Sequence, residues 1–395
     1  MQKTPLSNRL HIALIGPMNA GKSSLMNALS GQDLAIVSEV AGTTTDPIVK
    51  AVEIIGLGPV AFIDTAGLND KSELGAARVK KTKQMLKRAN AVCLVFDASN
   101  FNEAEIAEVT ATSPVSDAQT ILIFNKIDKL SAEERSALNQ KFPDALLISA
   151  EQNFGTDMVR DALIQCLQDI QEEHLIGDLL PPGSIIILVT PIDSEAPKGR
   201  LILPQVQVLR DCLDYGHLTT VVQVDELAKA IEVMQPDIVI TDSQAFKEVA
   251  TIVPDDIFLT SFSILFARQK GDLQYFVNSL QDLDTLTNPR VAIIESCSHN
   301  FTHEDIGRFK IPNFLKKKFG ENISIDFYMG NDFVERMDDY DLLIHCGGCM
   351  TNRQTIQSRV ETAREYETPM INYGMFLAYA TGTLDRALLF FEDKI

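Results

Sequence analysis

The sequence predicts an α/β protein of three domains, each built on a mostly parallel sheet with flanking helices. Short apolar runs alternate with longer helix-like stretches along all 395 residues. Each run is followed by turn-forming residues, as is typical of buried parallel strands. Such alternation indicates strand–helix–strand units and doubly wound sheets. The pattern is interrupted after the first domain by Pro181-Pro182-Gly183, which ends any helix.

The apolar runs divide the chain into three blocks, and we expect domains at residues 1–172, 183–263 and 265–395. The strand candidates of the first block are His11–Ile15, Val60–Ile63, Val92–Phe96, Ile121–Phe124 and Leu146–Ile148. Those of the second and third blocks are Ile185–Val189, Thr219–Val222, Ile238–Ile240, Val291–Ile294, Ile323–Phe327, Leu342–Ile344 and Met370–Asn372. Open edges on two such sheets would favour a homodimer or a higher oligomer.

The composition excludes several classes of protein. A formal net charge of −19 argues against binding to nucleic acid, which depends on neutralising phosphates. No apolar stretch reaches the roughly 18 residues that span a bilayer, and the polar N-terminus lacks the features of a secretory signal. We therefore expect a cytoplasmic protein without membrane contact, in which the six cysteines are thiols or metal ligands rather than disulfides.

A phosphate-binding loop lies at residues 16–23, whose sequence Gly-Pro-Met-Asn-Ala-Gly-Lys-Ser fits the pattern G-x-x-x-x-G-K-[ST]. It follows a predicted strand and precedes a predicted helix, so its backbone N–H groups can surround phosphates at a helix N-terminus. We expect Lys22 to reach the β- and γ-phosphates and Ser23 to bind magnesium. The expected phosphate contacts come from Asn19, Ala20, Gly21, Lys22, Ser23 and Ser24.

Three further motifs, each at the end of a predicted strand, indicate that the bound nucleotide is GTP and that the domain is a GTPase. In Asp64-Thr65-Ala66-Gly67, Asp64 can hold magnesium through water and the Gly67 N–H can contact the γ-phosphate. In residues 125–128, Asp128 can accept two hydrogen bonds from guanine, while Asn125 and Lys126 brace the loop. A last contact to guanine is expected from the backbone at Ser149-Ala150.

The first switch is expected at residues 42–46, where Thr44 is our candidate for the magnesium-binding threonine that senses the γ-phosphate, with Thr43 and Thr45 as alternatives of the same chemistry. The predicted catalytic residues are therefore Lys22, Thr44 and Gly67. Leu68 stands where Ras-like GTPases have a glutamine that orients water, so we expect slow intrinsic hydrolysis unless another group assists.

Taken together, these motifs resemble those of bacterial Era-type and tRNA-modification GTPases over about 160 residues. In relatives with an asparagine at the position of Asn19, that residue helps to hold a potassium ion beside the phosphates. The resemblance therefore implies that K⁺ stimulates hydrolysis here.

A second constellation lies in the third block, where cysteines and histidines follow two predicted strands. Cys297-Ser298-His299 comes after one strand and His345-Cys346-Gly347-Gly348-Cys349 after another. Loops at the carboxyl ends of parallel strands face one crevice, so we expect the three thiols to meet. Three thiolates suit zinc or an iron–sulfur cluster, and because two additional histidines exceed what structural zinc needs, we favour a 4Fe-4S cluster. A redox Cys-x-x-Cys pair or three unrelated core cysteines remain alternatives.

Over its whole length the chain resembles FeFe-hydrogenase maturation GTPases. The resemblance rests on a GTPase domain followed by Cys-x-His and His-Cys-x-x-Cys, and on the stretch from Pro191 to Arg200. It implies a scaffold that holds a 4Fe-4S cluster through Cys297, Cys346 and Cys349, with His345, His299 or Asp193 as a labile ligand. It also implies a two-iron precursor as cargo, delivered from radical-SAM maturases to apo-hydrogenase, with Lys198 and Arg200 available to pair with its negative charge.

Two other functions fit parts of the sequence. One is a ribosome- or RNA-associated Era-like GTPase with a structural zinc module, and the other is a metal sensor with regulatory nucleotide binding. The acidic composition and the lack of a recognisable RNA-binding module argue against the first.

Overall fold

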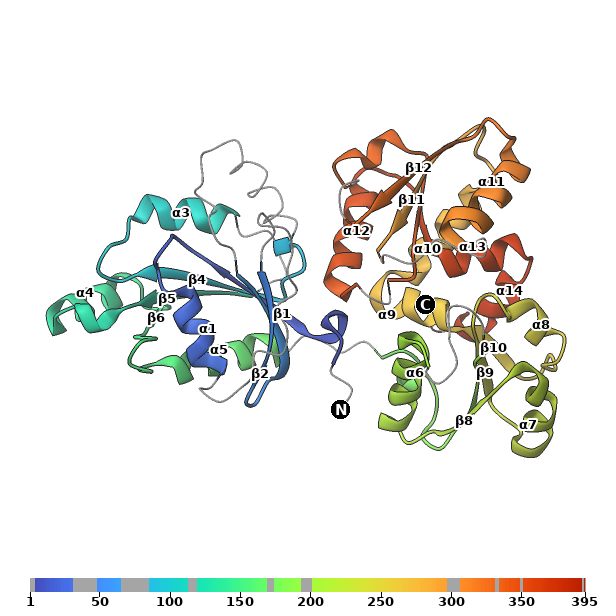
Figure 1. The fold of residues 1–395 in the computed structure, drawn as a ribbon, viewed down its shortest axis with the longest axis horizontal. Helices are drawn as coiled ribbons and strands as arrows, with labels where there is room; N and C mark the ends of the chain where they lie inside the picture. The colour runs from blue at the N-terminus through green and yellow to red at the C-terminus, as the bar shows by residue number, and fades with distance from the viewer. Residues whose placement is uncertain are drawn as a thin grey trace. The chain divides into compact units, whose positions relative to one another are not determined.

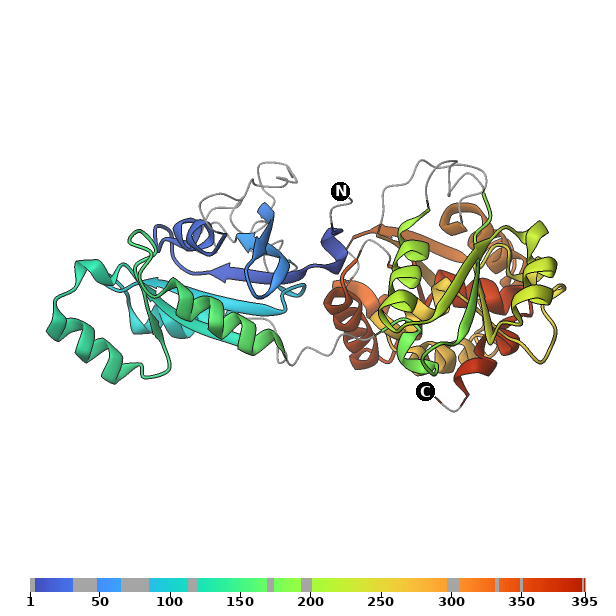
Figure 2. The ribbon, with the colours of Figure 1, turned by 90° about the horizontal axis from the view of Figure 1, so that it is seen from below.

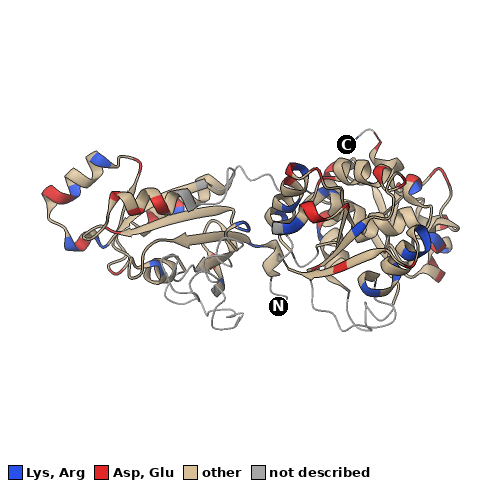
Figure 3. Cartoon of the chain, turned by 90° about the horizontal axis from the view of Figure 1, so that it is seen from above, with Lys and Arg blue, Asp and Glu red and all other residues tan. Residues whose placement is uncertain are grey.

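The computed structural model describes residues 4–30, 48–64, 85–112, 119–168, 174–192, 201–296, 306–330, 334–348, 351–392 and 394. The chain forms two compact units, Met1–Glu172 and Glu173–Ile395. The predicted α/β class is confirmed, because the described strands form three largely parallel sheets flanked by helices (Figure 1). Charged residues gather on helices and loops while the strands carry few (Figure 3). In these ranges no helix is both long and apolar enough to cross a membrane.

The first unit contains a sheet with the strand order β2-β3-β1-β4-β5-β6. Its β1, β3, β4, β5 and β6 run parallel, and β2 pairs antiparallel with β3. The strands are β1 Leu10–Ile15, β2 Ile48–Ile54, β3 Gly58–Asp64, β4 Ala91–Asp97, β5 Gln119–Asn125 and β6 Leu146–Leu147. The helices are α1 Lys22–Ser30, α3 Glu103–Thr112, α4 Ala132–Lys141 and α5 Thr156–Gln168.

Both faces of this sheet are buried, which explains why its strands read as continuous apolar runs. In β1, Ile12 and Leu14 pack on the face covered by α1 and α5, whereas Ala13 and Ile15 pack on the face covered by α3 and α4. Strand β2 did not stand out in the sequence because it lies at the sheet edge, where Lys50 and Glu53 interrupt its apolar pattern.

The second unit contains two parallel sheets, with the orders β10-β9-β7-β8 and β12-β11-β13-β14. The strands are β7 Ile185–Val189, β8 Leu218–Val222, β9 Ile238–Thr241, β10 Phe258–Ser261, β11 Arg290–Glu295, β12 Ser324–Met329, β13 Leu342–His345 and β14 Met370–Asn372. The helices are α6 Leu203–Asp214, α7 Leu227–Met234, α8 Phe246–Ala250, α9 Phe262–Lys270, α10 Leu273–Asp282, α11 Ile311–Phe319, α12 Arg353–Glu365, α13 Tyr373–Ala380 and α14 Leu384–Leu388.

One hydrophobic core joins the two sheets of this unit. Helix α9 lies between them and packs against α6 on one side and against α12 and α13 on the other (Figure 1). In the view from below, the sheet β10-β9-β7-β8 with its helices lies nearer to the viewer than the sheet β12-β11-β13-β14 (Figure 2). Phe262, Leu265 and Phe266 of α9 are almost fully buried. This helix therefore contributes side chains to the core that the two sheets share.

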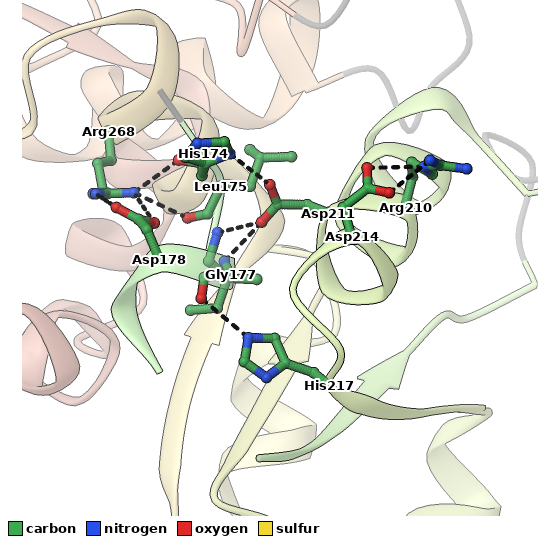
Figure 4. Close-up of polar contacts among 10 residues, drawn as sticks. His174, Leu175, Gly177, Asp178, Arg210, Asp211, Asp214, His217 and Arg268 are labelled. Atoms are coloured by element: carbon green, nitrogen blue, oxygen red, sulfur yellow. Dashed lines mark hydrogen bonds and ion pairs between the residues drawn. The ribbon is translucent and has the colours of Figure 1, made fainter. Parts of the chain in front are cut away.

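Charged side chains form hydrogen bonds and an ion pair with the first residues of the second unit that the structure describes (Figure 4). Asp211 accepts hydrogen bonds from the backbone N–H groups of Ile176 (2.8 Å) and Gly177 (2.7 Å). Arg268 donates to the carbonyl of His174 at 2.7 Å and forms a two-pronged ion pair with Asp178. The chain that arrives from the first unit is thereby fixed in place from residue 174 onward.

Candidate functional site

The phosphate-binding loop connects β1 to α1 and depends on two glycines that have no room for a side chain. A Cβ at Gly16 would lie 1.9 Å from the carbonyl oxygen of Val95. Gly21 has a φ of +91°, and a Cβ there would lie 2.2 Å from Nδ2 of Asn125. The backbone can therefore close tightly around the start of α1, as a phosphate-binding loop requires.

Lys22, the first residue of α1, lies inside this loop. Its side chain is buried, and its Nζ donates to the carbonyls of Gly16 and Pro17, both at 2.8 Å. The ammonium group is thus held at the centre of the turn, where it can exchange a carbonyl for a phosphate oxygen. Ser23 and Asn19 are exposed on the loop, and Asn19 has a left-handed φ of +64°.

Asn125 joins the phosphate-binding loop to the loops at the ends of β5 and β6. Its side chain is 2% exposed, donates to the carbonyl of Ala20 at 3.0 Å and accepts from the N–H of Ala150 at 2.9 Å. Ser149 and Ala150 are themselves buried. A single amide therefore holds together the loops that were predicted from separate motifs.

The carboxylate expected to recognise guanine, Asp128, has a buried oxygen. Its Oδ1 has no hydrogen-bond partner among the described residues. A buried acceptor without a partner is costly unless a donor reaches it, so this oxygen is suited to the N–H groups of a bound base. The side chain of Asp128 thus fits the role that the sequence predicts for it.

One residue of the site, Asp97 at the end of β4, was not predicted. Its Oδ2 lies 2.7 Å from Nζ of Lys126, and Lys126 also donates to the carbonyl of Asn19. Burial would raise the pKa of Asp97, but hydrogen bonds from Lys126 and Ser99 outweigh it and lower the pKa. Asp97 follows an apolar strand as the recognised motif residues do, and that position was the available signal.

The predicted switch residues fall largely outside the described part of the chain. Asp64 is the last residue of β3, with its backbone beside Leu14 of β1. Thr44, Gly67 and Leu68 lie outside the described residues, as do Cys297, His299, Cys349, Asp193, Lys198 and Arg200 of the predicted metal site.

The two cysteine-bearing segments leave the sheet from neighbouring strands. β11 and β13 pair in parallel, with Ile294 opposite His345, so both segments start at the same edge. The backbone N–H of Ser296 donates to Sγ of Cys346 at 3.2 Å, and the N–H of Cys346 donates to the carbonyl of Ile294 at 2.9 Å. The Cys346 sulfur is therefore in contact with the residue that precedes Cys297.

The donor groups in this region suit a metal centre. N–H groups that donate to a cysteine sulfur stabilise its thiolate form, which is the form that binds metals. His345 is 2% exposed and packs against Phe276, and neither ring nitrogen has a hydrogen-bond partner within the described residues. Burial, together with the positive charge of Arg359, lowers the pKa of His345 to about 3, so its imidazole is neutral.

The other described cysteines behave as core residues. Cys93 and Cys212 are buried and Cys166 is half-buried, and burial raises the pKa of all three thiols. Among the residues that the structure describes, no three histidine, cysteine, aspartate or glutamate side chains cluster as a complete metal site.

Comparisons with known proteins identify the first unit as a GTPase domain. Residues 11–126 match a model described as 50S ribosome-binding GTPase. The tRNA modification GTPase MnmE of Flavobacterium psychrophilum is 35% identical over 164 residues, which cover 40% of this chain and 35% of that protein. MnmE of Chromobacterium violaceum is 35% identical over 163 residues, covering 41% and 36%. The chain thus matches only about a third of these relatives.

Two solved structures are similar to part of the chain. Aquifex aeolicus Era bound to GDP and AlF4⁻ has a TM-score of 0.33 and 18% identity, covering 56% of this chain and 97% of that one. The G domain of the T. maritima FeoB iron transporter has a TM-score of 0.32 and 21% identity, covering 41% and 100%.

Two further models match the second unit. Residues 175–271 match the hydrogen maturase F dimerization domain, and residues 274–390 match the hydrogen maturase F tetramerization domain. These two matches together account for more than half of the chain, support an oligomeric protein and follow the segment that matches the GTPase model. On these grounds the chain belongs to the hydrogen maturase F family, the GTPases of hydrogenase maturation.

Proposed function

We propose that this GTPase is a scaffold that binds a 4Fe-4S cluster, receives a two-iron precursor and delivers it to apo FeFe-hydrogenase. The observation that carries the proposal is the hydrogen bond from the Ser296 N–H to the Cys346 sulfur, at the edge where both cysteine segments leave the sheet. It supports the use of Cys346 as a thiolate and the approach of the Cys297 segment to it.

The proposed ligands are Cys297, Cys346 and Cys349. Three protein thiolates leave one iron of a four-iron cluster open to a ligand that can be exchanged. His345, which is neutral and buried next to Cys346, supports this arrangement either as that ligand or as a neighbour that excludes water. His299 and Asp193 remain proposed alternatives for the exchangeable ligand.

In the GTPase domain, we propose that Ser23 and Thr44 bind Mg²⁺ and that Asp64 holds it through water. The base would lie between Asn125, Lys126, Asp128 and the Ser149-Ala150 backbone, and Asn19 would help to hold K⁺. GTP would act as a switch: contacts of Thr44 and Gly67 with the γ-phosphate order the loops, and hydrolysis releases them. Binding of the radical-SAM maturases and of apo-hydrogenase would then differ between the GTP and GDP states.

Within the second unit, we propose that residues 183–263 form the dimer contact of a homodimer and that residues 265–395 hold the cluster. Strand β8 supports the first assignment because it is an edge strand with exposed apolar side chains. Leu218 is 60% exposed and Val221 38%, and Leu213 nearby in sequence is 59% exposed. Unpaired strand edges with such side chains readily pair with another chain.

The test is anaerobic reconstitution of the full chain with iron and sulfide, followed by absorption and EPR spectroscopy. We expect a 4Fe-4S signal in the wild type, a strong loss of bound iron in Cys346→Ala, and no change in the matched control Cys166→Ala. Loading with a synthetic two-iron precursor should then activate apo-hydrogenase. Binding of zinc with no cluster would contradict the proposal and favour a GTPase with a structural zinc module.

A further inference from the structure

A buried lysine contacts the described residues on either side of positions 349 and 350. Lys270, the last residue of α9, is 4% exposed, and its Nζ donates to the carbonyl of Gly348 at 3.0 Å and to the carbonyl of Thr351 at 2.9 Å. These two carbonyls bracket residues 349 and 350, and the carbonyl of Gly348 belongs to the peptide bond that leads into Cys349. The ammonium group therefore binds the two described residues, Gly348 and Thr351, that flank these positions.

A buried arginine forms similar hydrogen bonds beside the other cysteine segment, at the residue before Cys297. Arg359 of α12 is 2% exposed and donates to the carbonyl of Gly330 at 2.9 Å and to Oγ of Ser296 at 3.3 Å. Ser296 is the residue whose N–H donates to the Cys346 sulfur. Arg359 thus holds the end of β11 at the point where the chain continues to Cys297.

Two buried cations at one edge of a sheet require a physical explanation. Burying a charge costs several kcal/mol, so a buried lysine or arginine is retained where its charge or its donors serve a purpose. Cysteine thiolates and the clusters that they bind are anionic, and positive charge in a low-dielectric environment stabilises them. The two cations come from different helices, yet both donate to segments that lead into cysteines.

We propose that Lys270 and Arg359 are the positioning residues of the cysteine segments, and that their charges compensate the negative charge of a thiolate-bound cluster. This inference rests on the proposed function, because it concerns the same cluster. Lys198 and Arg200, which we expect to pair with the two-iron precursor, lie outside the described residues, whereas Lys270 and Arg359 belong to no sequence motif.

The sign of the expected effect follows from electrostatics. Adding an electron makes a cluster more negative, so a nearby cation favours the reduced state and raises the reduction potential. Removing the charge should lower that potential, and removing the donors should also loosen the segments and speed the loss of iron.

The experiment compares full-length wild type, Lys270→Gln, Arg359→Gln and the control Lys229→Gln after anaerobic reconstitution. Lys229 is an exposed lysine of α7, so its replacement removes the same charge far from any cysteine motif in sequence. We expect EPR-monitored redox titration to give more negative midpoint potentials for the Lys270 and Arg359 variants, and a chelator to remove their iron several-fold faster. The control should match the wild type.

The possible outcomes separate the two proposals. If the wild type holds a cluster and both Gln variants keep its midpoint potential and its rate of iron loss, the inference is overturned while the proposed function stands. If the wild type takes up no iron, the proposed function fails first. Should Lys270→Gln not fold, Lys270→Arg keeps the charge but displaces the donors. An unchanged potential with faster iron loss then supports the inference, and wild-type iron loss overturns it.

Discussion

Replacing Asn125 by alanine should weaken nucleotide binding through the loops that this side chain joins. Its amide donates to the carbonyl of Ala20 and accepts from the N–H of Ala150, at 3.0 and 2.9 Å, in a position that is 2% exposed. Removing it leaves one buried acceptor and one buried donor unpaired, at a cost of roughly 1–3 kcal/mol for each group. Allowing for partial relaxation and water entry, we expect a loss of about 2–4 kcal/mol.

That free energy should appear mainly in the affinity for nucleotide. The two loops need a defined arrangement to surround phosphate and base, and a smaller population of that arrangement weakens apparent binding in proportion. A loss of 2–4 kcal/mol corresponds to roughly 30- to 1000-fold weaker binding. Titration calorimetry or a fluorescent GDP analogue measures this directly, and thermal unfolding followed by circular dichroism reports whether the variant is folded.

Two comparisons make the result interpretable. Asn125→Asp keeps the acceptor for the Ala150 N–H but places a buried carboxylate oxygen against the Ala20 carbonyl, so its affinity should fall at least as far as that of the alanine variant. Asn139→Ala, at an exposed position of α4, should bind like the wild type. If folded Asn125→Ala binds GDP within threefold of the wild type, the role assigned to this amide is wrong.

Three further predictions concern the same unit. Gly21→Ala should abolish detectable GDP binding in the same assay, because its Cβ would meet Asn125 at 2.2 Å in a backbone with a φ of +91°; binding near the wild-type level would contradict this. Burial lowers the pKa of His11 from 6.5 to about 4, so the unfolded state binds more protons between these values. The contribution of neutral His11 to the free energy of unfolding is present above about pH 6.5 and is lost as the pH falls towards 4, by roughly 3 kcal/mol in all. Urea unfolding of His11→Gln should lack that part of the pH dependence. If Asn19 helps to hold K⁺, GTP hydrolysis should be several-fold faster in KCl than in NaCl and lose this difference in Asn19→Ala, whereas equal wild-type rates would exclude the idea.

Much of the fold could be predicted from the sequence because a parallel strand that is buried on both faces consists of an uninterrupted run of apolar residues. All twelve strand candidates correspond to strands in the structure, with ends displaced by a few residues. Strand β2 was missed because an edge strand with Lys50 and Glu53 does not form such a run, and β10 because only Phe258 and Leu259 of its four residues are apolar.

The residues of the candidate site could be predicted only where they belong to a short motif that is continuous in the sequence. The glycine loop and the guanine-binding residues form local motifs, so spacing alone identifies them. Asp97, Lys270 and Arg359 belong to no motif, because their roles arise from contacts between residues 29 to 81 positions apart in the sequence. Such partners become visible only when the chain is folded.

The core shared by the two sheets of the second unit has a consequence for how this part of the protein unfolds. The dimerization and tetramerization models meet between residues 271 and 274, directly after α9, yet α9 packs against helices that belong to both. A cleavage there would expose apolar faces on each half, so neither half should be stable alone. Heating should melt the two in one cooperative transition, and limited proteolysis should release them as a single resistant fragment.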